Sequence, residues 1–388
     1  GITKMNLQHK LIACALIGFA GMFTIQSANA IPSFAAKHDK KCSSCHTAWP
    51  QLNAKGRAFK EDGYRLESEV KEGTESPIEA ESLRSIISLF LTARPYDKKD
   101  SGDLLLRALQ EAELFVVGAI DDNFSGFMVF EAEDEIGFNV EIATATLAYR
   151  YNAEINLNLG YSQVFESDPY SFLSNSLRLT RGRPATIDRG FDGSDRLRDK
   201  RQQVTLTGRV AHKLFYSASF TGAPKNNEGE DPQGIAARIA YDIADDFMVG
   251  VFHWSGEELL TNSTSITEFT RNGFDFQVDV ANTRFSGGYI LATDETLGST
   301  GETDNVAVSF QAFHTMRSKS GKPTWVPLVR YDSYERNDGA DQFDELTLNV
   351  GYYFQENTKG FIEYWSQLAT PDGVQEDNRL TLQMQVGF

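Results

Sequence analysis

From about residue 83 to the C-terminus, apolar and polar residues alternate along the chain. Clear runs of this kind lie at 155–161, 204–210, 274–280 and 346–352. Successive side chains of a β-strand point to opposite faces, so each run predicts a strand with one apolar and one polar face. In a helical fold the apolar residues would instead recur about every 3.6 residues. The pattern therefore predicts a mainly β structure for more than three quarters of the chain.

Sixteen candidate strands can be counted in this region. They begin near residues 83, 105, 124, 140, 154, 202, 214, 234, 246, 270, 283, 305, 324, 343, 358 and 378. Connections after even-numbered strands are generally short, and those after odd-numbered strands are often longer, the longest being 165–201. An even strand number and alternating loop lengths are typical of outer-membrane barrels, whose apolar face meets lipid. We therefore expect residues 83–388 to form a transmembrane antiparallel β-barrel of about 16 strands, porin-like.

Residues 1–30 have the pattern of an export signal. Lys10 is followed by an apolar run over 11–25 and then by Ser27-Ala28-Asn29-Ala30. This order predicts leader residues and a secretory signal peptide that is cleaved after Ala30. A lipoprotein signal at Cys14 is the alternative, although Cys14 precedes most of the apolar run.

Charge and hydropathy exclude two further classes of protein. The formal net charge is −17, and it becomes −19 without Lys4 and Lys10, the only residues of 1–30 counted in it. Such an acidic chain lacks the basic patches that nucleic-acid binding requires, so no nucleic-acid partner is expected. No later stretch is apolar for about twenty residues, so no transmembrane helix is predicted.

Cys42-Ser43-Ser44-Cys45-His46 is the attachment pattern of c-type haem. Two thiols at this spacing add to the two vinyl groups of haem, and the following imidazole then ligates the iron. A disulfide loop, a redox dithiol and half a zinc site are the alternatives. A zinc site needs further ligands, and no other cysteine remains after signal cleavage. A redox dithiol would lie in a βαβ pattern, which this segment lacks. We expect one covalent haem c on Cys42 and Cys45, with His46 as an axial ligand.

The residues after the motif predict a small α-helical haem domain over 31–65. Thr47 to Pro50 form a turn, and Gln51 to Asp62 form a short helix that ends at Gly63. Gly56 lies inside this helix, where glycine costs about 1 kcal/mol relative to alanine, which suggests that a flat group such as the porphyrin approaches it closely. A glycine that the helix merely tolerates is the alternative. The expected residues of the haem pocket are Trp49, Pro50, Leu52, Gly56 and Phe59.

The second axial ligand is left open by the sequence. No methionine lies between Ile31 and Glu113, and His38 is the only other histidine in the haem domain. The alternatives are a water-ligated or open site and three distant histidines, His212, His253 and His314. Residues 66–82 are polar and acidic and are expected to be a linker to the barrel.

Two charged regions of the predicted barrel loops are candidate sites. The long connection 165–201 carries an arginine cluster that, folded into the lumen, would pair with haem propionates or with the plug; it includes Arg178, Arg181 and Arg183. An exposed loop of mixed charge is the alternative. A second group of acids is expected on an outer loop, where carboxylates would attract Fe(II); it comprises Glu131, Glu133, Asp134 and Glu135. Ordinary solvated loop acids are the alternative there.

The segment 31–64 resembles the fused monohaem cytochrome–porin family of outer-membrane iron oxidases. The matching positions are Pro32, Phe34, Cys42, Cys45, His46, Ala48, Pro50, Leu52, Asn53, Gly56, Phe59, Gly63 and Tyr64. The most specific part is the haem motif followed by A-x-P-x-L, and the rest of the chain is similar only in its barrel architecture.

The resemblance implies a role and a location. It implies an iron(II):cytochrome oxidoreductase that takes electrons one at a time from extracellular Fe(II) and passes them to a periplasmic c-type cytochrome. The protein would lie in outer-membrane lipid, with its haem domain in the barrel lumen or at the periplasmic mouth. A substrate-selective porin gated by a haem plug, or an electron conduit for a different donor, is the alternative function.

Overall fold

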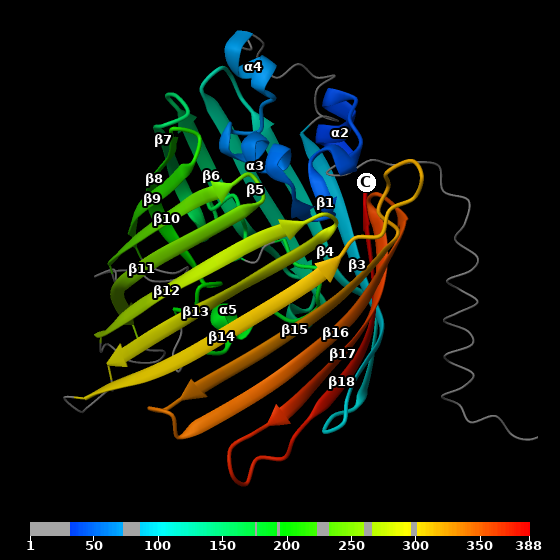
Figure 1. The fold of residues 1–388 in the computed structure, drawn as a ribbon, viewed down its shortest axis with the longest axis vertical. Helices are drawn as coiled ribbons and strands as arrows, with labels where there is room; N and C mark the ends of the chain where they lie inside the picture. Colours follow the sequence, from blue (N-terminus) through cyan, green and yellow to red (C-terminus); the bar gives the residue numbers. More distant parts are fainter. Residues whose placement is uncertain are drawn as a thin grey trace, which may run out of the picture.

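The computed structural model describes residues 32–72, 86–174, 177–191, 195–222, 233–259, 266–295 and 301–388. Within these ranges sixteen antiparallel strands close into a barrel in sequence order, and β18 pairs with β3 (Figure 1). The strands are β3 (Ile87–Lys99), β4 (Leu104–Ala119), β5 (Phe124–Glu133), β6 (Val140–Arg150), β7 (Asn156–Gln163), β8 (Lys200–Val210), β9 (Leu214–Thr221), β10 (Gly234–Ala244), β11 (Phe247–Leu259), β12 (Ile266–Val280), β13 (Thr283–Glu295), β14 (Glu302–His314), β15 (Trp325–Arg336), β16 (Asp341–Gln355), β17 (Thr358–Ala369) and β18 (Asn378–Gly387). Each strand begins within four residues of its predicted start, so the predicted 16-strand antiparallel barrel is confirmed.

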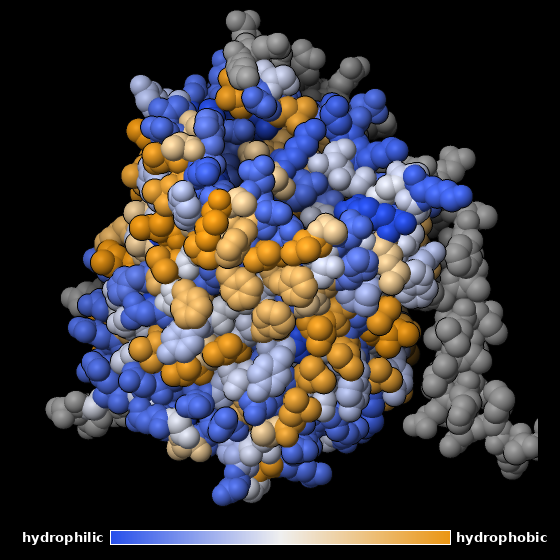
Figure 2. Space-filling model, viewed as in Figure 1, coloured by the Kyte–Doolittle hydropathy of each residue, from blue (hydrophilic) through white to orange (hydrophobic). Residues whose placement is uncertain are grey.

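The outside of the barrel is apolar because alternate side chains of each strand face outward. On β10, Ile235, Ile239 and Tyr241 are exposed, whereas the intervening Ala236 and Arg238 are buried in the lumen. Figure 2 shows apolar side chains gathered across the barrel wall, with polar side chains toward its ends. An apolar wall between polar ends is the surface that a bilayer-spanning barrel presents to lipid.

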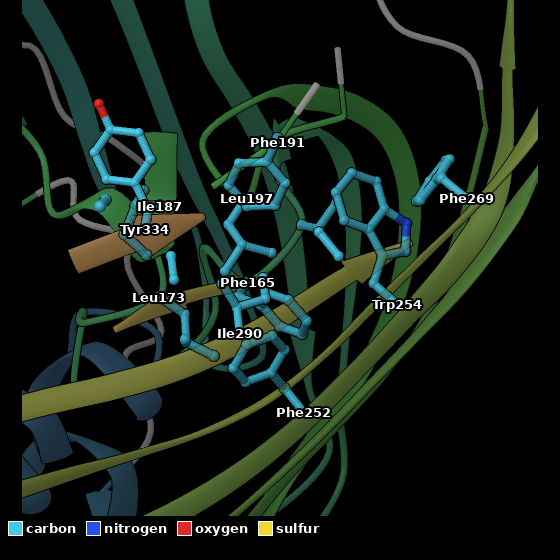
Figure 3. Packing of buried hydrophobic residues seen from close by; sticks show 14 of the residues in the cluster. Phe165, Leu173, Ile187, Phe191, Leu197, Phe252, Trp254, Phe269, Ile290 and Tyr334 are labelled. Atoms are coloured by element: carbon cyan, nitrogen blue, oxygen red, sulfur yellow. The ribbon is translucent and has the colours of Figure 1, made fainter. Parts of the chain in front are cut away.

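The connection between β7 and β8 folds into the barrel, and we call residues 164–199 the inward segment. Its short helix α5 (Ala185–Asp188) packs against β14 and β15, where the Ala185 N–H donates to Asp332 Oδ1 at 2.8 Å. Apolar side chains of the inward segment meet aromatic and aliphatic side chains of the wall in one buried cluster (Figure 3); it includes Phe165, Leu173, Ile187, Leu197, Phe252, Trp254 and Ile290. The inward segment therefore fills the part of the lumen that faces β10 to β16.

Residues 32–72, which we call the N-terminal segment, sit at the barrel end that holds the C-terminus (Figure 1). Short turns join the strands at this end, such as those between β4 and β5 and between β16 and β17. The segment contains α2 (Pro32–His38), the 3₁₀ turn η1 (Cys42–Ser44), the short strands β1 (His46–Ala48) and β2 (Gln51–Leu52), α3 (Ala54–Glu61) and α4 (Glu67–Glu72). No helix in the described ranges is long and apolar enough to cross a membrane.

The helix predicted over Gln51–Asp62 is shorter than expected. It begins at Ala54, because Asn53 caps it and Gln51–Leu52 pairs with β1 instead. The first residues of the predicted linker 66–82 form α4, and most of the remainder lies outside the described residues. The predicted signal peptide, residues 1–30, also lies outside them.

Candidate functional site

A cavity of about 630 Å³ lies between the N-terminal segment and the inner wall of β3 to β7. It brings together four groups of side chains that are distant in sequence. These are the motif residues Cys42, Cys45 and His46, the pocket residues Trp49, Pro50, Leu52, Gly56 and Phe59, the wall glutamates Glu111, Glu113, Glu131 and Glu133, and the inward-segment residues Arg178, Arg183 and Arg198. Small-molecule and cofactor sites commonly have volumes of about 300–1,000 Å³.

The two cysteines are placed by the tight turn η1. The Ser44 N–H donates to the Lys41 carbonyl at 2.9 Å, and the Cys45 N–H donates to the Cys42 carbonyl at 3.1 Å. This turn places both thiols on the same cavity, and no disulfide joins them. Burial raises the pKa of the Cys45 thiol, and nearby Lys55 opposes that shift. Both cysteines are therefore placed for attachment of one group.

His46 has the hydrogen-bonding arrangement of an iron ligand. Its Nδ1 lies 3.0 Å from the Pro50 carbonyl oxygen, which can only accept, so Nδ1 carries the proton. Metal-binding histidines generally donate their second ring N–H in this way, which leaves Nε2 for the metal. Burial lowers the pKa of His46 to about 4, although the hydrogen bond to Pro50 opposes this. The imidazole is thus held neutral at physiological pH, as ligation requires.

Gly56 lies where α3 crosses the haem motif. A Cβ at this position would be 2.1 Å from the carbonyl oxygen of Cys45, so no larger residue fits without moving the motif. The close approach that we expected here is made by the Cys45 backbone, although Gly56 also lines the cavity. The glycine therefore sets how near α3 can lie to the cysteines.

Asn53, one of the positions that match the resembled family, is a positioning residue whose role the sequence did not predict. Its Nδ2 donates to the Ser44 carbonyl at 3.1 Å, and its backbone N–H donates to the Cys45 carbonyl at 3.0 Å. Its Oδ1 accepts from the Gly56 N–H at 3.0 Å and so caps α3. An asparagine just before a helix signals a cap, but its contacts with the motif appear only in three dimensions.

Aromatic side chains close the cavity between the N-terminal segment and the wall. Trp49 stacks on Phe90 of β3 with ring centroids 5.5 Å apart, and the Tyr353 hydroxyl donates to the Trp49 carbonyl. Phe59 meets Phe34 edge to face at 5.0 Å. The residues expected to form the haem pocket thus lie together around one apolar side of the cavity.

The acids do not lie where the sequence analysis expected them. Glu131 and Glu133 belong to β5, because the strand alternation continues to residue 133, and they face the lumen instead of an outer loop. Opposite them on β4 stand Glu113 and Glu111, as the pairs Glu113–Glu131 and Glu111–Glu133. One carboxylate oxygen from each of Glu111, Glu131 and Glu133 lies within 4.8 Å of the others.

Asp134 and Glu135, the other two acids of the predicted group, form part of the turn η3 (Asp134–Ile136). Arg107 pairs with both of them, at 3.4 Å to Asp134 Oδ2 and 2.6 Å to Glu135 Oε1. The predicted acidic loop is thus divided into two carboxylates that face the lumen, of which Glu131 pairs with Lys200 at 3.3 Å, and two that pair with Arg107 at the rim.

The predicted arginine cluster is also divided. Arg181 pairs with Asp97 of β3 at 2.9 Å, whereas Arg178 and Arg183 line the cavity. Burial lowers the pKa of Arg183, and with the like charges of Arg178 and Arg198 the value falls to about 9. Crowded guanidinium groups of this kind favour an anion such as a haem propionate beside them.

Ion pairs fix the N-terminal segment to the barrel wall. Glu61 pairs with Arg209 of β8 at 2.6 Å, and Asp62 pairs with Arg150 of β6 at 2.8 Å. Arg65 donates to the Phe124 carbonyl at 2.7 Å, at the start of β5. Contacts on several strands hold the cysteines and His46 at one place in the lumen.

The described residues fit a covalent haem. They offer two thiols at the attachment spacing, a neutral imidazole with Nε2 left for iron, an apolar side and arginines for propionates. His38 also lines this cavity, whereas His212, His253 and His314 are not among its lining residues.

No protein-family model and no curated protein sequence matches the chain. Solved structures do resemble it. An anion-selective porin from Comamonas acidovorans has a TM-score of 0.62 at 12% identity, with 78% of this chain and 98% of that chain covered. A loop L8 deletion mutant of OmpT, an outer membrane protein of Vibrio cholerae, has a TM-score of 0.57 at 14% identity, with 78% and 99% covered. These likenesses establish a porin-like barrel fold, and about a fifth of this chain lies beyond it.

Proposed function

We propose that this protein is an outer-membrane barrel that oxidises extracellular Fe(II) at a c-type haem and passes the electrons to a periplasmic c-type cytochrome. One observation carries the proposal: Glu111, Glu131 and Glu133 line the same cavity as Cys42, Cys45 and His46. Carboxylates suited to a hard cation and residues suited to haem therefore share one space.

Placement in the outer membrane is supported by the closed barrel and its apolar outer surface. One of the porin-like neighbours, OmpT of Vibrio cholerae, is described as an outer membrane protein. Short turns generally face the periplasm in such barrels. The N-terminal segment sits at the short-turn end, which in our proposal faces the periplasmic acceptor.

The chain's own residues would hold the cofactor. Cys42 and Cys45 would bind it through thioether bonds, and His46 Nε2 would ligate its iron. Arg178 and Arg183 would face its propionates. When bound, the haem supplies reversible one-electron redox chemistry.

The wall glutamates would gather the substrate. Fe(II) prefers oxygen and nitrogen ligands, and clustered carboxylates raise the local concentration of a divalent cation. Each Fe(II) loses one electron and becomes Fe(III), and the acceptor cytochrome gains that electron. No bond to carbon forms or breaks, so the site needs no general acid, general base or nucleophile.

Anaerobic mixing of the purified protein with Fe(II) at neutral or mildly acid pH tests the proposal. We expect the haem absorption spectrum to change to that of the reduced protein. A haem that dithionite reduces and Fe(II) does not would contradict iron oxidation.

The alternative is a substrate-selective porin gated by its haem plug. Single-channel conductance in planar bilayers tests it. The inward segment fills part of the lumen and the N-terminal segment lies at one end of the barrel (Figure 1), so our proposal expects conductance well below that of an open porin. Open-porin conductance together with a haem that Fe(II) does not reduce would favour the alternative.

A further inference from the structure

One side chain of the haem cavity has an unexplained buried nitrogen. The His38 side chain is 6% exposed and lines the cavity together with His46. Its Nδ1 lies 3.6 Å from Glu69 Oε1. Its Nε2 is buried and has no hydrogen-bond partner among the described residues. A buried polar atom without a partner costs about 1–3 kcal/mol, so a missing partner is expected at this nitrogen.

His38 is held in place from two sides. Its ring meets the Phe59 ring edge to face with centroids 5.5 Å apart, and Phe59 itself lines the cavity. The helix α2 that carries His38 is fixed to β3, where the Ser33 N–H donates to Ser88 Oγ at 3.3 Å. Glu69 occupies the Nδ1 side of the imidazole, so Nε2 is the nitrogen left for a ligand in the cavity.

Methionine and histidine are the usual second ligands of c-type haem, and the described lining of this cavity offers few of them. No methionine is among the lining residues, and His38 and His46 are the only histidines there. His253 instead contacts Asn272 and Ser255 on the wall, and His314 contacts Thr283 beside a turn. The three distant histidines that the sequence left open therefore lie away from the haem motif.

We propose that His38 Nε2 is the second axial ligand, so that one haem iron is bound by the imidazoles of both His38 and His46. The inference rests on the haem part of the proposed function and is independent of Fe(II) as donor. Glu69 Oε1 lies 3.6 Å from Nδ1, and a hydrogen bond from Nδ1–H to this carboxylate would fix the tautomer and orientation of a ligating histidine.

This ligand set restricts how iron is oxidised. With both axial positions taken by protein, no bridging ligand could join the substrate Fe(II) to the haem iron. The electron would then pass from Fe(II) near the wall glutamates to the edge of the porphyrin. The two parts of the cavity would thus have separate roles. The carboxylates on β4 and β5 would gather Fe(II), and the imidazoles on the N-terminal segment would ligate the haem iron.

Spectroscopy of the haem-loaded full-length protein in detergent tests the inference. We expect the oxidised wild type to give the low-spin signal of two imidazole ligands in electron paramagnetic resonance. His38→Ala is expected to lose that signal and become high-spin, and added imidazole is expected to restore it. His38→Met is expected to raise the haem potential, as methionine ligation does in cytochromes c. The matched control is His314→Ala, which removes a histidine outside the cavity and should leave the spectrum unchanged.

Two results would overturn the inference. One is a high-spin wild type, which needs no variant and is informative even if His38→Ala fails to fold. The other is a His38→Ala protein that keeps the low-spin spectrum of the wild type. Fe(II) reduction is measured separately on the same wild-type sample. A two-imidazole haem that Fe(II) does not reduce would retain this inference and reject iron oxidation.

Discussion

The two sides of the barrel lumen differ in how their charges are satisfied. Facing β10 to β16, the inward segment fills the lumen with apolar side chains, and the buried ions there are paired, as Arg238 is with Asp168 at 3.1 Å and Asp275 at 2.6 Å. Facing β3 to β7, a 630 Å³ cavity remains, with clustered glutamates, crowded arginines and two histidines. A buried charge is costly unless an opposite charge pairs with it, so a region of the lumen with only a structural role is expected to have its buried charges in ion pairs. The incompletely paired side is therefore the side that is built for ligands.

The largest expected effect tests the cavity side. Replacing both Cys42 and Cys45 by Ala should abolish covalent haem completely, because both attachment thiols are lost. Haem staining of a denaturing gel measures this, and the heat-dependent gel shift of folded barrels checks that the barrel still forms. Ser43→Ala, which removes the side-chain hydrogen bond to Glu356 and keeps the backbone one, is the matched control and should keep its haem. Haem retained by the double variant would contradict the assignment.

The next effect tests the packed side. Arg238→Ala leaves Asp168 and Asp275 buried without their cation and should lower the free energy of unfolding by about 3–5 kcal/mol. Urea titration of the folded barrel in detergent measures the loss. The rim pair of Arg107 with Glu135 gives the control, since Arg107→Ala should cost no more than about 1 kcal/mol. Equal losses of unfolding free energy in Arg238→Ala and Arg107→Ala would contradict the greater cost that we expect for breaking the buried ion pairs.

A smaller effect is expected from the wall glutamates. The triple change of Glu111, Glu131 and Glu133 to Gln should slow haem reduction by Fe(II) about tenfold or more, since it removes the charges that concentrate the cation. Stopped-flow absorbance measures the rate. Asp134→Asn with Glu135→Gln is the matched control, because Arg107 already neutralises these acids. Loss of rate in the control alone would place the iron path at the rim.

The smallest effect is that of salt. Exposed charges are screened beyond about 10 Å at 0.1 M ionic strength, whereas partly buried charges are screened much less. Because Glu131 and Glu133 face the lumen, we expect the Fe(II) reduction rate to fall only a few-fold between low and physiological salt. Rates measured across that range check this, and a fall of several orders of magnitude would favour capture by the outer loops instead.

The barrel could be predicted from the sequence because apolar and polar residues alternate along its strands. This alternation arises because one face of each strand meets lipid and the other meets the lumen. That Cys42, Cys45 and His46 line one cavity could be expected from their close spacing, whereas covalent haem at these residues stays a prediction. The acids were misplaced because nothing local marks the end of β5, and Glu131 and Glu133 alternate like other strand residues. Glu111 and Asn53 were missed because their roles depend on pairing with β5 and on contact with the motif turn. Such contacts arise from closure of the barrel around the N-terminal segment.

The central claim is that this chain carries electrons from Fe(II) on one side of a membrane to an acceptor on the other through the haem cavity. Liposomes that contain the protein and enclose a soluble c-type cytochrome test it most directly when Fe(II) is added outside without oxygen. We predict reduction of the enclosed cytochrome with the wild type and none with the variant in which Cys42 and Cys45 are both Ala. Equal rates for the two proteins, or no reduction with the wild type, would contradict the claim.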